Sequence, residues 1–598
     1  MAKRNVPIKY TSRDFDSIRK DLIDYAKRYY PNTFQDFSEA SFGSLMLDTV
    51  AYVGDIMSFY LDYQVNESFI DTSVEYDNII RLAQQMGYKF KGADSATGLV
   101  SFYAIVPANS TGLGPDTTYM PILKRNSVVS SDGGGSYILT EDVRFDNPNN
   151  DVVAGRVNAT TGIPSSYAIK ATGQVISGQF GIKTVTVGDF ERFKKIAIGN
   201  SNIVEIVSVF DSEGNEYFEV EYLSHDVVYK AVPNKDSNTK DNAPSLIRPF
   251  IATRRFVTRK TRTSFILQFG FGSSTQIATP SLADPSNVIL QRHAKDYITD
   301  IAFDPSDLLG TDKLGVGPAN TTLTITYRVN TAKSANAAAG SIKTIANSIV
   351  EFNDPTITNT TTAKEAIASL ECSNEEPIAG SISRPTVEEI RMQALNVLPA
   401  QNRAVTSTDY EALSYAMPSY YGAIKRCRMV RDQDSLKRNL NLYVISEDTN
   451  GKLIQSNSAL KDNLKVWLNR YRMVNDTVDI LDAKIVNIGI EFEVISNEEI
   501  NRYEVLDNAV RALRQRFSQT MFIGERFYIT DVYTELNKVR GVADTSKVRV
   551  VNKSGGSYTS SALNIKQFTS LDGRYVSVPD NVVLEIKFPK IDIKGTVR

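Results

Sequence analysis

The amino-acid sequence predicts a multidomain α+β protein with an N-terminal helical bundle, a mostly antiparallel β middle region and C-terminal α/β sandwich-type domains. Three observations predict this fold class. Up to about residue 92, apolar residues recur at helical spacing. From about residue 96 they alternate with polar residues, as in sheets with one buried face. Beyond residue 385, strand and helix patterns follow one another, which is typical of sheets covered by helices.

Length and composition limit the kind of protein this can be. At 598 residues the chain is too long for one ordinary core, so we expect roughly three or four domains. Its 67 lysines and arginines nearly balance 69 aspartates and glutamates, which argues against a nucleic-acid-coating role. Two lone cysteines, Cys372 and Cys427, favour assembly in a reducing cytoplasm. We recognise neither a membrane span nor a signal peptide.

We expect the chain to be organised around a long helix between Phe42 and about Phe69. This stretch contains no proline, and its only glycines are Gly43 and Gly54. Apolar residues occupy most of its circumference, so the helix must be buried on several sides. These residues are Leu45, Met46, Leu47, Val50, Val53, Ile56, Met57, Tyr60 and Leu61.

One narrow polar line interrupts the apolar surface of this helix. Asp48, Asp55 and Asp62 follow one another at seven-residue intervals and fall close to one stripe. Two interpretations are open. The line is either a solvated stripe on a core helix, or part of a helix that joins a bundle with other chains. Aspartates in mid-helix argue against a membrane span.

Shorter helices flank the long one. The first is expected from about Arg13 to Tyr30, where a proline ends it. The second follows the sequence TSVE, in which Thr72 and Glu75 have the spacing of a capping box, and it ends at Gly87.

Alternating segments predict a mostly antiparallel β region over residues 96–330. The expected strands lie at 100–106, 218–222, 265–269 and 323–329, and the turn DSEGN at 211–215 predicts a hairpin. Residues 331–383 are rich in alanine, threonine and serine, so they form either a small surface subdomain or a connector between two halves.

The C-terminal half begins with a helix whose capping box pairs Thr386 with Glu389. Further strands are expected at 440–446, 487–495 and 582–588, and further helices at about 460–471, 506–517 and 532–539. We expect the final segment, IDIKGTVR, to lie at the surface or to bind a partner.

No residue pattern indicates catalysis. His225 and His293 are the only histidines, neither has the spacing of a metal ligand, and no G-x-S-x-G elbow is present. We therefore expect no enzyme activity, no cofactor and no metal site. Carboxylates are plentiful, so a glycosidase pair could still lie anywhere in the sequence.

One dense basic run, at 248–262, has two interpretations. Phe250 and Phe256 are interleaved with its arginines, which could suggest contact with nucleic acid. The alternative is an edge strand protected by charge. We favour the edge strand and expect no nucleic-acid partner, because the charge of the whole chain is balanced.

Two ordered sets of motifs resemble the baseplate J-like family of phage tail proteins. The first set comprises the glycine-led helix 43–63, N-E-x-F-x-x-T at 66–72, L-A-x-x-x-G-Y at 82–88 and the strand entry at 93–106. The second comprises R-A-x-T-x-x-D-Y at 403–410 and G-E-x-x-x-x-x-D-V-Y-x-x-L-x-x-V-x-G-V at 524–542. Each motif alone is weak, but their order is specific, and the resemblance covers residues 36–551.

This resemblance implies a structural subunit of a baseplate wedge in a contractile-tailed phage. Such a subunit would dimerise within a wedge, bundle its N-terminal helices with other wedge proteins, and join wedges into the inner baseplate ring around the hub. The ring would relay conformational change to sheath contraction, so hub and sheath-initiating proteins are implied partners. The implied location is the tail baseplate of the virion, after assembly in the host cytoplasm. A tail-associated cell-wall hydrolase or a receptor- or DNA-contacting tail protein are the alternatives.

The candidate interface residues fall into two groups. The helix-bundle residues are Leu45, Leu47, Val50, Val53, Ile56, Tyr60, Asp48, Asp55 and Asp62. The residues of the inter-subunit ring region are Arg403, Thr406, Asp409, Tyr410, Val532 and Leu536.

The expected domains are a helical partner-binding domain at 1–95, a β-rich domain at 96–330, a connector at 331–383, an α+β ring-forming domain at 384–552, and a strand with a tail at 553–598. If residues 331–383 are a connector, limited proteolysis should cut there first and leave a stable fragment beginning near residue 385. Mass spectrometry of the fragments checks this, and first cuts within 440–540 would show that the boundary is misplaced.

Overall fold

The structure is a computed structural model, and the residues it describes are 14–29, 41–90, 94–109, 114–157, 162–199, 202–233, 245–261, 264–273, 314–330, 335–401, 403–432, 439–448, 450–497, 501–517 and 520–598. The chain divides into two compact units. The first unit is formed by Met1–Lys89 with Pro385–Leu398, and the second by Phe90–Arg384 with Pro399–Arg598.

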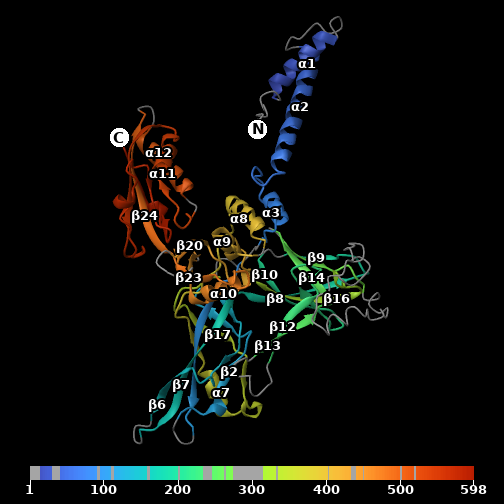
Figure 1. The fold of residues 1–598 in the computed structure, drawn as a ribbon, viewed down its shortest axis with the longest axis vertical. Helices are drawn as coiled ribbons and strands as arrows, with labels where there is room; N and C mark the ends of the chain where they lie inside the picture. The colour runs from blue at the N-terminus through green and yellow to red at the C-terminus, as the bar shows by residue number, and fades with distance from the viewer. Residues whose placement is uncertain are drawn as a thin grey trace. The chain divides into compact units, whose positions relative to one another are not determined.

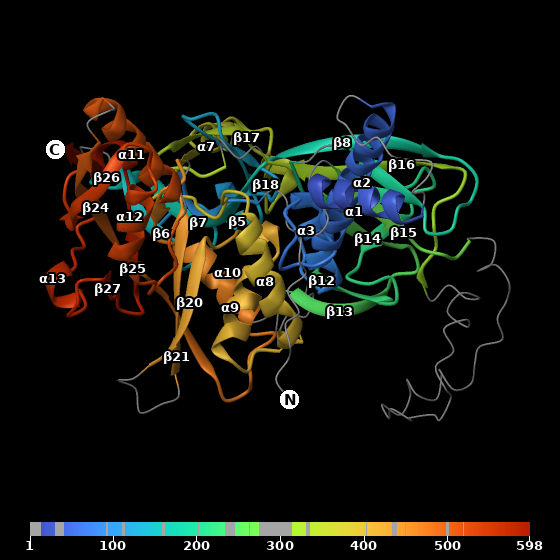
Figure 2. The same ribbon diagram turned by 90° about the horizontal axis from the view of Figure 1, so that it is seen from above.

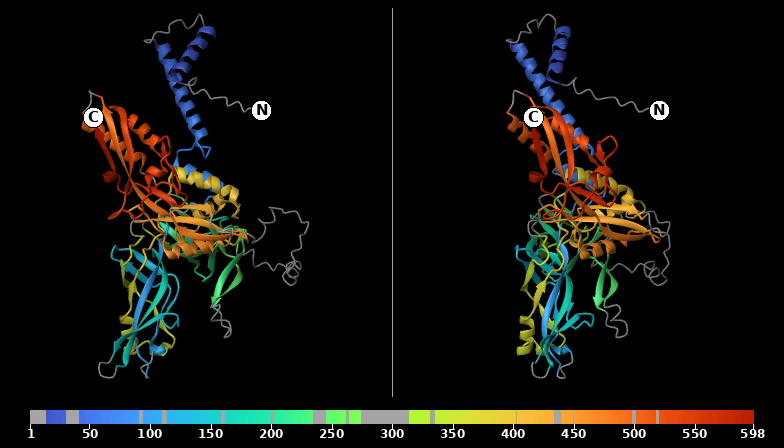
Figure 3. Two further views of the ribbon diagram at one scale, coloured as in Figure 1. Left: turned by 60° about the vertical axis from the view of Figure 1, so that its left-hand side comes forward. Right: turned by 90° about the vertical axis from the view of Figure 1, so that its left-hand side faces the viewer.

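The first unit is helical, as the sequence predicts. Its helices are α1 (Phe15–Tyr29), α2 (Phe42–Asn66), α3 (Tyr76–Gln85) and α8 (Val387–Ala400), of which α8 ends just beyond the unit. Helices α1 and α2 lie side by side as a hairpin, drawn in blue in Figure 1 and seen from two further sides in Figure 3.

The joint between α2 and α3 is held by Glu67, which is buried. Its carboxylate accepts hydrogen bonds from the backbone amides of Val74 at 2.8 Å and Glu75 at 3.2 Å, and from the Asn78 side chain at 3.0 Å. The Val74 amide and the Asn78 side chain together hold the pKa of Glu67 below its ordinary value. The predicted Thr72–Glu75 capping box is wrong, because the Thr72 hydroxyl donates to the Asn66 carbonyl instead.

Helix α8 is fastened to this joint. Its predicted capping box is confirmed, since the Thr386 amide donates to the Glu389 carboxylate at 2.8 Å and the Glu389 amide donates to the Thr386 hydroxyl at 3.3 Å. Arg391 then donates to the carbonyls of Ile70 at 2.7 Å and Ser73 at 3.0 Å. A helix from the middle of the sequence thus completes the N-terminal helical unit.

Two large sheets form the middle region, and most of their pairings are antiparallel, which confirms the predicted fold class. The first sheet has the order β17 (Ile342–Asn347), β3 (Val128–Ser131), β4 (Ser136–Leu139), β7 (Pro164–Ser177), β1 (Thr97–Pro107) and β19 (Glu371–Ser373), with β6 (Asp151–Val157) also paired to β7. A small sheet of β18 (Val350–Phe352), β2 (Pro121–Leu123) and β5 (Val143–Arg144) and helix α7 (Thr361–Ala368) accompany it.

The second sheet curls toward a barrel. Its order is β8 (Gln179–Val187), β16 (Thr321–Val329), β10 (Ile203–Phe210), β11 (Glu216–Glu219), β14 (Arg255–Lys260), β15 (Phe265–Phe269) and β9 (Lys195–Ile198). Its two end strands approach each other, because Lys183 on β8 donates to the Ala197 carbonyl on β9 at 3.3 Å. Strands β12 (Val227–Pro233) and β13 (Ser245–Ile251) form a separate hairpin.

A buried arginine joins the two sheets. Arg328, on β16, is 1% exposed. It donates to the Ser95 hydroxyl at 2.7 Å and to the Ser177 carbonyl of the first sheet, and it pairs with Glu205 on β10 at 2.7 Å. Gly178 permits this approach, because a Cβ there would lie 2.8 Å from the Arg328 side chain. Breaking such a buried ion pair costs several kcal/mol, about 3–5 in typical cases.

The C-terminal region holds two further sheets, each covered by helices. In the first, β20 (Arg426–Arg431), β21 (Asn439–Glu447) and β23 (Thr477–Asp482) share a core with α9 (Ser407–Tyr415) and α10 (Ser458–Leu468). Strand β22 (Leu453–Ile454) pairs with β21 in the same sheet. In the second, β24 (Lys484–Ser496) lies between β26 (Val542–Lys553) and the strands β28 (Val582–Glu585) and β29 (Ile593–Val597). Helices α11 (Arg502–Arg516) and α12 (Ile529–Asn537) lie against this sheet (Figure 2).

The smaller C-terminal elements are α13 (Ile565–Phe568), α14 (Pro589–Asp592), and the paired strands β25 (Phe527–Tyr528) and β27 (Tyr575–Val576). Asn457 links this region to the first sheet of the middle region. Its side chain caps α10 by accepting the Leu460 amide at 2.9 Å, and it donates to the Thr97 carbonyl at 2.5 Å.

Two sequence-based expectations are corrected here. The edge-strand prediction for the basic run holds only in part, because β14 is an interior strand between β11 and β15, whereas β13 belongs to the two-stranded hairpin with β12. Arg255 of β14 is 2% exposed and donates to the carbonyls of Leu223 and Ala252, both at 2.7 Å. The C-terminal tail is not a free surface segment either, because β29 pairs in parallel with β24 and Ile593 is buried.

Residues of the expected connector take part in the sheets of the middle region. Strand β17 pairs with β3, β18 with β2, and β19 with β1, and Ile342, Cys372 and Ile378 lie in the core of the first sheet. These pairings weigh against early cleavage within them. The domain boundaries themselves stay predictions, which proteolysis tests.

Replacement of Glu67 by alanine should expose the N-terminal turn of α3. The Val74 and Glu75 amides would lose their acceptor, and their exchange with deuterium should become faster, as read by hydrogen–deuterium exchange mass spectrometry of peptides covering 67–86. Thr72→Ala is the matched control and should leave these amides protected. Because the folded pKa of Glu67 is lowered, this protection should persist at neutral pH and be lost on acidification through that pKa. If both variants lost amide protection equally, Thr72 would contribute to capping α3, as predicted from the sequence.

Candidate interaction surfaces

The α1–α2 hairpin packs with its apolar residues outward. The only fully buried residues of α2 in the described chain are Ser44 and Ala51. The exposed apolar side chains of α2 range from 39% to 72% exposure. They are Phe42, Leu45, Met46, Val50, Tyr52, Val53, Met57, Phe59, Tyr60, Leu61, Tyr63 and Val65. We call this set the α2 apolar surface.

The stripe that faces α1 is made of small and polar residues. Arg19 on α1 pairs with Asp48 at 2.5 Å and donates to the Ser44 hydroxyl at 3.3 Å. Gly54 lies against Ile18, where a Cβ would be 3.4 Å from the isoleucine side chain. Asp55 and Asp62 are also only partly exposed. The interpretation of α2 as a core helix with a solvated aspartate stripe is therefore wrong for the described chain.

The apolar helix-bundle residues chosen from the sequence differ in exposure. Leu45, Val50, Val53 and Tyr60 belong to the α2 apolar surface, whereas Leu47 and Ile56 are half-buried. Sequence reasoning missed Tyr52, Phe59 and Tyr63, although aromatic residues at helical spacing were visible in the sequence.

The motif at 403–410 builds the start of α9. The Asp409 carboxylate accepts the amides of Thr406 at 2.8 Å and Val405 at 3.1 Å, and the Thr406 hydroxyl accepts the Asp409 amide. Burial raises the pKa of Asp409, but the hydrogen bonds outweigh it, so the pKa is lowered overall. The motif therefore forms a complete capping box.

Most of the ring-region residues chosen from the sequence are buried in the chain's own core. Tyr410 is 1% exposed, and its hydroxyl donates to Asp476 at 2.7 Å. Val532 and Leu536, on α12, are 0% exposed and pack in the core around β24. Of the six residues, Arg403 and Thr406 remain exposed. Their role in contacts between subunits stays a prediction.

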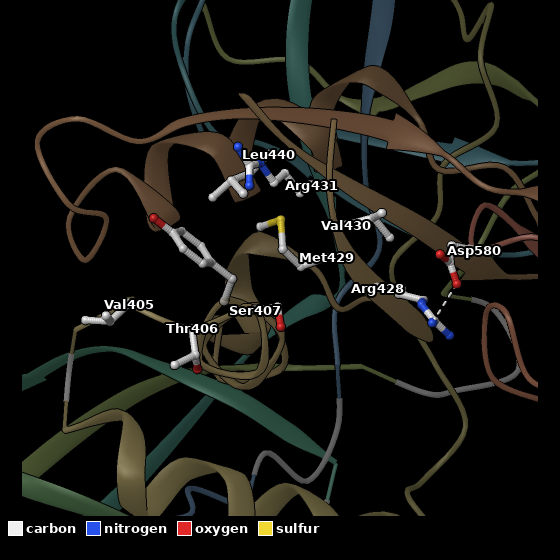
Figure 4. Close-up of a pocket in the computed structure, with 10 residues that line it drawn as sticks. Val405, Thr406, Ser407, Arg428, Met429, Val430, Arg431, Leu440 and Asp580 are labelled. Atoms are coloured by element: carbon white, nitrogen blue, oxygen red, sulfur yellow. Dashed lines mark hydrogen bonds and ion pairs between the residues drawn. The ribbon is translucent and has the colours of Figure 1, made fainter. Parts of the chain in front are cut away.

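A hollow of about 310 Å³ lies beside this motif. Figure 4 shows Val405 and Thr406 on one side of it and Arg428 with Asp580 on the other. Arg428 pairs with Asp580 at 2.7 Å and donates to the Ile523 carbonyl at 2.8 Å. The hollow is lined by a single carboxylate, which is already paired, so it lacks the two carboxylates that glycoside hydrolysis uses.

Other features associated with catalysis are scattered. His225 is exposed, with its ring edge-on to that of Tyr222, and His293 lies outside the described residues. Within the described ranges, no three histidine, cysteine or carboxylate side chains gather as a metal site would require. Among the helices that the structure describes, none is long and apolar enough to cross a membrane.

Residues 14–85 match the family model described as "Bacteriophage baseplate protein, N-terminal domain". This segment, which contains α1, α2, the Glu67 joint and α3, is similar to the N-terminal domain of bacteriophage baseplate proteins. No curated protein matches the chain.

Two solved structures are similar to the chain at low sequence identity. One is titled "Cryo-EM structure of the anti-feeding prophage (AFP) baseplate, 6-fold symmetrised", with 9% identity, a TM-score of 0.24, and coverage of 96% of this chain and 98% of that chain. The other is the type VI secretion system TssK-TssF-TssG baseplate subcomplex, with 10% identity, a TM-score of 0.26, and coverage of 73% and 96%. At these TM-scores the two similarities carry no further inference.

The capping box at α9 should stabilise the subdomain that contains the single tryptophan, Trp467. Asp409→Ala removes the acceptor of two backbone amides and should lower the free energy of unfolding by about 1–2 kcal/mol. Asp409→Asn keeps one acceptor oxygen and should lose less. Trp467 donates to the Leu413 carbonyl of α9, so its fluorescence during urea unfolding reports on this helix. The lowered folded pKa of Asp409 means that its contribution is present at neutral pH and lost on acidification. An alanine variant as stable as wild type would contradict the assignment.

Proposed function

We propose that this chain, whose N-terminal segment is that of a phage baseplate protein, is a wedge subunit of the baseplate J-like kind that joins other chains through the α2 apolar surface. The observation that carries the proposal is the exposure of this surface in the isolated chain. Soluble proteins rarely leave such a large contiguous apolar surface in water unless it is an interaction site.

Within the first unit, no described element covers this surface. Helix α1 packs on the small and polar stripe and leaves the apolar faces open. Burying each large apolar side chain stabilises a complex by about 1.5–3 kcal/mol, so a handful suffices for a stable bundle. The fitting partners are apolar helices of a second copy and of other wedge proteins.

The same proposal assigns the remaining parts. The sheets of the second unit are joined by buried polar groups such as Arg328 and Asn457, which suits a stiff structural body. The chain passes between the two units three times, after Lys89, after Arg384 and after Leu398. The last crossing is followed by Pro399, which has no backbone N–H donor. We assign the second unit to the ring around the hub, and the crossings to the conformational change relayed to the sheath.

Val50→Asp should block assembly without unfolding the chain. Val50 is 54% exposed, so an aspartate there should change the free energy of unfolding by no more than about 0.5 kcal/mol. In a helix bundle the same aspartate would be buried without a partner, which costs several kcal/mol. The measurement is the mass of the complex formed with co-expressed tail proteins, by light scattering after size exclusion.

Val466→Asp is the matched control, because Val466 is 60% exposed on α10 and is not part of the α2 apolar surface. It should assemble as wild type does. If Val50→Asp also assembles at wild-type yield, α2 is not the assembly helix and the proposal fails. Adding Leu47→Ala, which trims a half-buried neighbour, should deepen the defect of Val50→Asp.

A further inference from the structure

The outer strand of the first sheet, β6, is unusual in its exposure. All seven of its residues are exposed, and among them Val152, Val153 and Val157 are 44%, 66% and 54% exposed. Strand β6 lies beside β7 at the edge of the sheet (Figure 1) and pairs with no other described strand. A row of backbone donors and acceptors therefore runs along its open edge.

Natural proteins protect open edges with charged side chains, above all lysine, with proline and with bulges. Strand β6 contains neither lysine nor proline. Its charged residues are Asp151 and Arg156, and its pairing with β7 shifts register twice near its end, between Ala154 and Arg156 and between Arg156 and Val157. An edge that offers both backbone groups and valine side chains matches the chemistry of another β-strand.

Pairing across three strands shows which way the side chains of β6 point. Val152 lies opposite Ile169 of β7, which lies opposite Ala104 of β1, and the latter two are 0% exposed. Val152 therefore points to the core face of the sheet. Val153 lies opposite Ala168, which lies opposite Ile105, itself 46% exposed, so Val153 belongs to the outer face.

The two charged residues of β6 share the outer face with Val153. Asp151 lies opposite Lys170 and Arg156 opposite Ser166, and both partners are two residues from Ala168 along β7. Lys170 is itself paired with Glu375. Within the described part of the chain, neither the Asp151 carboxylate nor the Arg156 guanidinium forms an ion pair.

We propose that β6 pairs antiparallel with β6 of a second copy of this chain, about a two-fold axis at Val153, so that the first sheet continues from one subunit into the next. Gly155 and Arg156 together occupy one position in the pairing of β6 with β7. In a pairing centred on Val153, Val153 therefore lies opposite Val153 of the copy. Asp151 of each strand then lies opposite Arg156 of the other. Val152 then faces Ala154 on the core face. Charges, apolar side chains and faces match in this one register.

The proposal goes beyond the baseplate role and does not depend on the α2 apolar surface. A chain with two separate self-complementary contacts can link into larger assemblies, whereas one contact stops at a dimer. With such a second contact, the middle region of the chain would also take part in forming the ring.

Val153→Cys tests the register directly. Directly opposed residues of an antiparallel pair have Cβ atoms about 4.5–5.5 Å apart, close to the span of a disulfide. Mild oxidation of the full-length variant should give a covalent dimer on a non-reducing gel. The native Cys372 and Cys427 are buried, so wild type should stay monomeric on the gel. Val152→Cys is the matched control, because its residue would face Ala154 and not another cysteine.

Charge exchange tests the ion pairs. Adding Asp151→Arg or Arg156→Asp to Val153→Cys sets like charges opposite each other and should lower the cross-linked fraction at least tenfold. Both changes together restore opposite charges and should restore cross-linking. Equal cross-linking of Val152→Cys and Val153→Cys would overturn the proposal. So would a cross-linked fraction that does not change when the charges at 151 and 156 are altered, or a Val153→Cys adduct with a different tail protein in place of a copy.

The same cross-linking in a Val50→Asp background separates this inference from the proposed function. Cross-linking at Val153 that persists when bundle assembly is blocked supports an independent β6 contact. Its loss in that background would show that β6 alone does not pair copies and would overturn the proposal, with the role of α2 left standing.

Discussion

The first unit depends on an imbalance in α2, which carries more apolar side chains than the described residues of that unit cover. Its contact with α1 uses Ser44, Asp48 and Gly54, which are small or polar positions on the helix. The apolar positions are left for water or for another chain. A helix arranged in this way is a poor core element, and in the proposed bundle its burial is completed when subunits meet.

In both units, buried polar side chains hold the ends of helices and the sheets in a fixed arrangement. Glu67 ties the end of α2 to the start of α3, and Arg391 of α8 ties the joint to a segment more than 300 residues away in sequence. Arg328 and Asn457 do the same between the sheets of the second unit. Each of these side chains satisfies several backbone or hydroxyl groups at once, so each specifies one geometry more strongly than apolar packing alone.

The proposed interaction surfaces and the recognisable sequence motifs are not the same residues in this chain. The 403–410 motif, which is easy to recognise by eye, is a capping box around a buried tyrosine. The residues of the proposed contacts are the less distinctive valines and aromatic residues of α2, and the valines of β6, which are exposed. A motif that forms a buried cap has a recognisable sequence because many hydrogen bonds and contacts limit which residues fit. An interface needs only exposed side chains of the right chemistry, so its sequence is less distinctive.

The sequence by itself determined the kind and position of most elements, including α2, β1, β16, β24 and the Thr386–Glu389 capping box, because periodicity and caps depend on residues within a few positions. It also determined that α2 has surplus apolar faces. Only the tertiary structure decided that Glu67 and not Thr72 serves the start of α3, that Arg255 lies on an interior strand, and that the tail joins the sheet of β24. The pairing of Ile490 with Ile593 and the face that α2 turns to α1 are contacts between distant segments, which local patterns do not encode.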